Sequence, residues 1–165
     1  MAPVGFRAAK ALHVALLFTT SATLAQAADA DNPYGDPPPL QATHGIARCP
    51  APKPRILTAE QARREAHQRV ERGTSCWLAG QCEPGGDYKH DGEINARVAA
   101  AIGSDARFAD SSLWVETLRK FVTIKGCLVA AKQGRDLETM VKAIDGVKLV
   151  WQEAVVVPQG VSKRQ

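Results

Sequence analysis

The fold is decided by residues 91–156, which read DGEINARVAAAIGSDARFADSSLWVETLRKFVTIKGCLVAAKQGRDLETMVKAIDGVKLVWQEAVV. Two amphipathic helices are predicted in this stretch. Residues 133–144 repeat apolar side chains at the i, i+3, i+4, i+7 spacing of one helical face, namely Leu137, Met140, Val141 and Ile144. Residues 91–102 form the other helix, whose apolar side carries Ile94, Val98, Ala101 and Ile102. Both helices need a surface against which to bury these faces.

That surface is predicted to be a sheet. Residues 112–118 and 121–130 are rich in β-branched and aromatic residues, and only two residues part them, which indicates a hairpin. After the second helix, Gly146 is free to take positive φ, and residues 147–157 are suited to a third strand. The order predicts an α+β fold of the αββαβ type, a small two-layer sandwich with a three-stranded mixed sheet and two helices on one face.

The same stretch carries a family pattern. It runs Leu113-x-Val115, then Val122-Thr123-Ile124-Lys125-Gly126, then a helix, then Asp145-Gly146-Val147-x-x-Val150. This succession resembles the BON domain, a small periplasmic module of osmotic-shock proteins, secretins and channels, and its most specific matches are Gly126, Gly146 and Val147. The resemblance implies an αββαβ domain over residues 91–157 without catalysis or cofactor. It also implies peripheral association with phospholipid membranes or envelope proteins, in envelope maintenance or osmotic stress.

The start of the chain predicts export. Residues 1–27 combine a basic beginning, an apolar stretch too short to span a bilayer and a small-residue cleavage site. We therefore expect a cleaved signal peptide and a periplasmic protein.

Two further segments separate the signal from the domain. Prolines dominate residues 28–56 and predict a linker without regular helix or sheet. Residues 57–90 begin with a helix that Thr58 caps and Gly73 ends, followed by a cysteine-containing extension. Residues 158–165 form a C-terminal tail.

Four cysteines in an exported chain indicate disulfides, with three possible pairings. The short loop between Cys76 and Cys82 favours a local bridge, which leaves Cys49 for Cys127. In the chain-entropy model the local bridge contributes about 2 kcal/mol and the long one about 4 to 5 kcal/mol. Zinc bound by Cys76, Cys82 and His90 is the alternative, but an obvious fourth ligand is missing.

One face of the predicted sheet lacks a helix layer. Alternation along the second strand turns Cys127 to this face, and Trp114 is expected there too. We expect the segment before residue 91, including Trp77 and Leu78, to pack over it. The competing interpretation is that Trp114 and Trp151 form a docking surface for lipid or protein.

Charge argues against a nucleic-acid partner. The whole chain has a net charge of +4, and removal of residues 1–27 takes away two basic residues and leaves +2. Residues 91–156 contain nine basic and nine acidic residues, so the domain has no net charge. Nucleic-acid binding would need a basic excess gathered on one face.

The compact basic-aromatic group of the domain is Arg119, Lys120 and Phe121, at the expected hairpin tip. These are the candidate lipid contacts, with Lys125 beside them. Each such charge near an anionic surface is worth only about 1 kcal/mol. A solvated turn is the alternative interpretation of the group.

No catalytic or metal site is predicted. The sequence shows no Ser, His and acid grouping within a motif, no Cys-x-x-Cys pair and no glycine-rich phosphate loop. The leading expectation is an exported, non-enzymatic module that associates with phospholipid. The alternative is a periplasmic adaptor that binds a protein on its open sheet face or by strand addition at a free edge.

Overall fold

The structure is a computed structural model that describes residues 38–157. The predicted signal peptide (1–27) and C-terminal tail (158–165) lie outside these residues. Along the chain the elements are β1 (Leu40–His44), α1 (Ala59–Leu78), the 3-10 helix η1 (Asp87–His90), α2 (Asp91–Ser104), the 3-10 helix η2 (Ala106–Phe108), β2 (Ser112–Leu118), β3 (Phe121–Leu128), α3 (Ala131–Lys142), β4 (Leu149–Gln152) and β5 (Val155–Val156).

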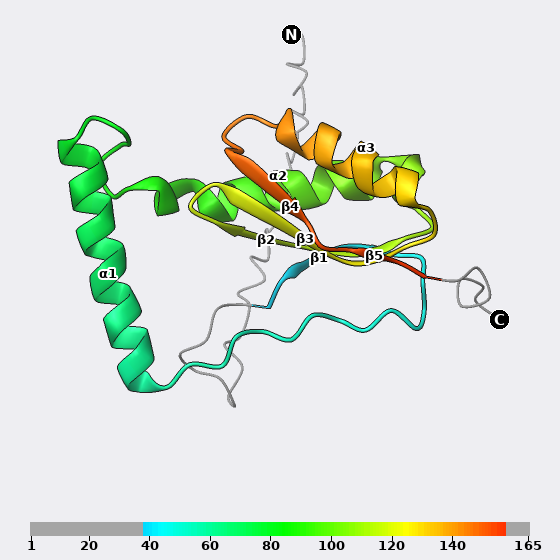
Figure 1. The fold of residues 1–165 in the computed structure, drawn as a ribbon, viewed down its shortest axis with the longest axis horizontal. Coiled ribbons are helices and arrows are strands. Elements are labelled where there is room, and N and C mark those ends of the chain that lie inside the picture. The colour runs from blue at the N-terminus through cyan, green and yellow to red at the C-terminus, as the bar shows by residue number, and fades with distance from the viewer. Residues whose placement is uncertain (1–37, 158–165) are drawn as a thin grey trace, which may run out of the picture.

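The α+β fold is confirmed, and its sheet is mixed. The strand order is β1-β2-β3-β4, with β5 also paired to β3. β1 and β3 both run antiparallel to β2, whereas β4 and β5 run parallel to β3. Figure 1 shows α2 and α3 together on one side of this sheet, as the αββαβ pattern predicts.

The core lies between these two layers. The predicted apolar faces of α2 and α3 meet the inward side of the sheet, and thirteen buried residues form one cluster. At its centre are fully buried side chains from every layer: Ile94, Val98, Ile102, Phe108, Leu113, Val115, Val122, Ile124, Leu137 and Val141. Helical and strand periodicity therefore identified most of the core correctly.

Within residues 38–157 the sheet has five strands, two more than the three that were predicted. β1 lies in the proline-rich segment 28–56, which was expected to contain no regular structure. Its five residues fall between two groups of prolines and contain none themselves. They keep every backbone N–H and can therefore pair with β2.

The third predicted strand, 147–157, is divided into β4 and β5. The interruption lies opposite Gly126 in β3, which has φ 129°, a conformation that side chains rarely adopt. A Cβ there would come within 2.1 Å of the Ser112 carbonyl oxygen. Gly126 thus bends β3 where it also approaches β2 closely, and the parallel ladder breaks beside it.

Helix α1 does not end at Gly73, as was predicted, but continues to Leu78. Gly73 is buried, and a Cβ added to Gly86 would meet its Cα at 2.7 Å. Its role is therefore close packing of α1 on the turn before η1, not helix termination. The Thr58 cap is present, with Gln61 completing a capping box. Among residues 38–157, no helix combines the length and the apolar content that crossing a membrane requires.

The segment that covers the open sheet face differs from the prediction. Trp77 and Leu78 are 49% and 74% exposed, so they do not cover it. Ile46 is buried instead, and its N–H donates to the Ser112 hydroxyl at 2.8 Å. The chain then continues along that side of the sheet towards α1 (Figure 1). Trp77 and Leu78 lie at the end of α1, which projects away from the sheet (Figure 1).

Both disulfides have the pairing that the sequence favoured. Cys49 is bonded to Cys127 across 78 residues, and Cys76 to Cys82 across six. The first pins the segment after β1 to the end of β3, and Trp114 is 8% exposed on the same sheet face. The second closes the C-terminal end of α1.

We predict that the long disulfide contributes more to stability than the short one. Cys49→Ser with Cys127→Ser should lower the free energy of unfolding by about 4 to 5 kcal/mol, and Cys76→Ser with Cys82→Ser by about 2 kcal/mol, because the longer loop restricts the unfolded chain more. Urea unfolding followed by tryptophan fluorescence measures both. Equal losses for the two pairs would contradict the argument.

Candidate functional site

The predicted hairpin tip is a two-residue turn in which both residues are left-handed. Leu118 pairs with Phe121, which leaves Arg119 and Lys120 with φ of 56° and 65°. Neither residue is Gly or Asn, which this conformation favours. The carboxylate of Asp91, the first residue of α2, accepts both turn N–H groups, at 2.7 Å from Arg119 and 2.8 Å from Lys120. These two hydrogen bonds hold the turn in its unusual conformation.

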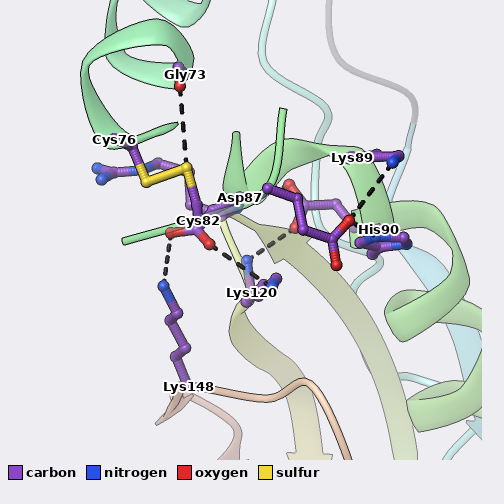
Figure 2. Close-up of polar contacts among 11 residues, drawn as sticks. Gly73, Cys76, Cys82, Asp87, Lys89, His90, Lys120 and Lys148 are labelled. Carbon is purple, nitrogen blue, oxygen red and sulfur yellow. Dashed lines mark hydrogen bonds and ion pairs between the residues drawn. A yellow bond between two sulfur atoms is a disulfide. The ribbon is translucent and has the colours of Figure 1, made fainter. Parts of the chain in front are cut away.

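A second aspartate binds the lysines around this turn. Asp87 in η1 has a side chain that is only 12% exposed, and it lies 2.6 Å from the Lys148 Nζ and 3.7 Å from the Lys120 Nζ. Figure 2 shows both lysines reaching it from different segments. The carboxylate therefore joins η1, the β2–β3 turn and the start of β4.

The pKa values of the two aspartates are shifted in opposite directions. Burial raises the pKa of Asp87, but the hydrogen bond and charge of Lys148, helped by Lys120, outweigh it and leave that pKa below its usual value. Burial raises the pKa of Asp91, and its hydrogen bonds from the turn only partly oppose this. Ionised Asp87 thus favours the folded state, whereas the ionisation of Asp91 costs free energy on folding.

The four predicted lipid contacts lie on one hairpin, but they are not equally available. Lys120 is paired with Asp87, and Lys125 lies 3.0 Å from the Glu116 carboxylate on β2. Arg119 has no carboxylate partner within residues 38–157. Its guanidinium carbon lies 5.9 Å from the Phe121 ring centre and 6.0 Å from that of Tyr88. Two of the three candidate cations are therefore largely neutralised.

An apolar patch adjoins this turn on the open sheet face. Pairing aligns Leu118 with Phe121 and Phe121 with Leu149, and Trp151 follows two positions along β4. Leu118, Leu149 and Trp151 are 54%, 39% and 49% exposed. The Phe121 and Trp151 rings meet edge to face with centres 5.6 Å apart. We call Leu118, Phe121, Leu149 and Trp151 the aromatic patch.

The two tryptophans of the alternative docking surface, Trp114 and Trp151, are not exposed together. Trp114 is buried, whereas Trp151 is exposed in the patch. Leu118 and Leu149 were missed, although strand alternation places both on the face of Phe121. The parallel register that places β4 beside β3 could not be predicted from the sequence.

The outer edge of β4 is unpaired within the described residues. The N–H of Lys148, just before β4, donates to the carbonyl of Lys120, just before β3, at 2.9 Å. By alternation, the backbone groups of Leu149 and Trp151 point away from β3. Beside this edge lies a groove of about 640 Å³ whose lining includes Gly134 and Arg135 of α3. This edge is therefore available for the addition of a strand.

No protein-family model matches this sequence, and no curated protein matches it. The resemblance to the BON domain therefore stays a prediction that rests on the residues quoted above. Within residues 38–157 there is no group of three or more His, Cys, Asp and Glu side chains placed to hold a metal ion. Cys76 and Cys82, the alternative zinc ligands together with His90, are joined in a disulfide.

We predict that the left-handed turn carries a conformational cost that glycine removes. Lys120→Gly should raise the free energy of unfolding by about 1 kcal/mol relative to Lys120→Ala, because both variants lose the ammonium but only glycine takes positive φ freely. Thermal or urea unfolding of the two variants measures the difference. An alanine variant as stable as the glycine variant would show that the turn is unstrained.

We predict a pH-dependent contribution from Asp87. Since its folded pKa is lowered, the stabilisation is fully present above the ordinary aspartate pKa and is lost as the pH falls through the folded pKa. Asp87→Asn should therefore destabilise the protein at neutral pH and match the wild type in acid. Asp145→Asn is the control, because Asp145 is exposed and its carboxylate pairs with no cation within residues 38–157. A pH-independent difference for Asp87→Asn would exclude the ion-pair mechanism.

Proposed function

We propose that this protein is an exported, non-enzymatic module of the cell envelope that associates with phospholipid surfaces through the aromatic patch. The observation that supports this proposal most is the exposed Trp151 on the open sheet face. Its ring packs edge to face against Phe121, and two exposed leucines belong to the same patch. Contiguous exposed apolar side chains mark interaction surfaces. The two disulfides are compatible with an oxidising, exported location.

The chemistry of the patch suits the boundary of a bilayer. Tryptophan favours the headgroup level, where its ring is apolar and its N–H stays hydrated. Cations surround the patch, since Arg119 stacks on Phe121 and Lys148 immediately precedes Leu149. Lys120, Lys148 and Asp87 together carry a formal charge of +1, so electrostatic attraction to anionic lipid is small. Apolar insertion should therefore dominate, with basic residues adding a preference for anionic headgroups.

A protein partner is the second candidate function, and the free β4 edge supports it. Leu149 and Trp151 offer outward backbone groups beside a groove next to α3. In strand addition, backbone hydrogen bonds supply affinity and alternate side chains enter neighbouring pockets. Such a partner would cover the same Trp151 that the membrane proposal uses.

The test is co-sedimentation of the protein, purified from a periplasmic expression host, with anionic and neutral vesicles. Trp151→Ser should abolish binding to both, because it removes the main apolar anchor. Trp77→Ser is a matched control, since both tryptophans are 49% exposed and Trp77 lies on α1 outside the patch. Arg119→Ser with Lys120→Ser should weaken only the binding to anionic vesicles, by about tenfold at most at low salt.

Two outcomes would overturn the membrane proposal. One is failure of the wild type to sediment with either vesicle, and the other is equal loss of binding in the two tryptophan variants. Capture of an envelope protein that Leu149→Pro abolishes would then favour strand addition, since proline removes an outward N–H from the β4 edge.

A further inference from the structure

A second site lies behind the hairpin tip, where α1 meets η1 and the end of β2. It is a pocket of about 210 Å³. Its lining comes from α1, η1, β2 and the segment before α1, namely Glu65, Gln68, Arg69, Arg72, Tyr88, Leu118 and Arg55. None of these residues except Leu118 belongs to the aromatic patch.

The charge of this pocket is positive and incompletely balanced. Its lining holds three arginines and one glutamate, a formal charge of +2. The glutamate is already engaged, because Glu65 lies 2.5 Å from the Arg55 guanidinium. Arg69 and Arg72 have no carboxylate partner within residues 38–157. Two cations facing one small space repel each other unless an anion lies between them.

A fourth guanidinium, that of Arg119 on the hairpin, contacts the Tyr88 ring that lines this pocket. The guanidinium carbons of Arg69 and Arg119 lie 5.4 and 6.0 Å from the centre of the Tyr88 ring. The half-buried ring attracts both cations through its π electrons. Tyr88, which lines the pocket, therefore contacts one cation from α1 and one from the β2–β3 turn.

The walls that carry these groups are fixed by contacts already described. The close approach of Gly73 and Gly86 holds α1 against the turn before η1, and the Cys76–Cys82 disulfide closes the end of the helix (Figure 2). Asp91 fixes the backbone that bears Arg119. A site whose cations are positioned before the ligand arrives has a smaller entropic cost of binding.

We infer that this pocket binds a phosphate monoester, with Arg69 and Arg72 as its main ligands and Arg119 at its mouth. A phosphate dianion matches the charge of the lining, and guanidinium forks suit its oxygens geometrically. The ring of Tyr88 and the side chain of Leu118 offer an apolar wall to the esterified group. Two sources share this chemistry, a soluble phosphate ester and a lipid headgroup. Only the lipid form rests on the proposed membrane function, because Leu118 is shared with the aromatic patch.

The test is titration of the purified protein with glycerol 3-phosphate and with inorganic phosphate, followed by arginine side-chain NMR shifts. The Arg69 and Arg72 signals should move together. Arg72→Ser should weaken binding of the ester by about tenfold or more, and Arg72→Lys should restore part of it, because lysine keeps the charge but not the fork. Arg63→Ser is the matched control on an exposed position of the same helix outside the pocket, and it should bind like the wild type.

Vesicles then separate the two sources of phosphate. If the ligand is a headgroup, the protein should bind vesicles with phosphatidic acid, a monoester, better than vesicles with phosphatidylglycerol, a diester. Arg72→Ser should erase this preference. Trp151→Ser should abolish binding to both kinds of vesicle. If the ligand is soluble, titration succeeds and the preference is absent. Unmoved arginine signals, or equal losses in Arg72→Ser and Arg63→Ser, would overturn the site. Loss of vesicle binding in Trp151→Ser alone would leave the phosphate site standing, because Trp151 does not line this pocket.

Discussion

The carboxylate of Asp91 accepts the backbone N–H groups of Arg119 and Lys120, and the arrangement of the hairpin end depends on this contact. A two-residue turn must take positive φ to match the twist of its strands, and here neither residue does so easily. An acceptor at the first residue of α2 compensates for that cost. In consequence the start of α2, the end of β2 and the start of β3 are held at one point. The orientation of Arg119 and the position of Phe121 follow from it.

Ion pairing determines which surface of this neutral domain is available for binding. Asp87 pairs with Lys120 and Lys148, and Glu116 pairs with Lys125. Most of the positive charge near the hairpin is therefore neutralised within the protein. The exposed groups that remain are apolar on the sheet face and cationic on the α1 side. The aromatic patch and the pocket lined by Arg69 and Arg72 therefore present different chemistry on two sides of one turn. Their shared residue, Leu118, places them next to each other.

Much of the fold was predictable because its signals are local. The apolar faces of α2 and α3 repeat with helical spacing, and β2 and β3 are uninterrupted runs of strand formers. The cysteine pairing was also predictable, since Cys76 and Cys82 are only six positions apart and their local bridge leaves the other two cysteines for each other. β1 was missed because the prolines around it dominated the composition of its segment. Gly73 was misinterpreted because a glycine in close packing looks the same in a sequence as a glycine that ends a helix.

The candidate site was less predictable. The sequence by itself identified Arg119, Lys120 and Phe121 as neighbours at a turn, because they are adjacent in the chain. It could not show that Asp87 neutralises Lys148 across 61 residues, or that Tyr88 faces Arg69 and Arg119 from a separate helix. Periodicity and propensity act within a few residues and so determine the elements and their buried faces. Which charges meet, and which side chains stay exposed, depends on contacts between distant segments, and only the tertiary structure decided these.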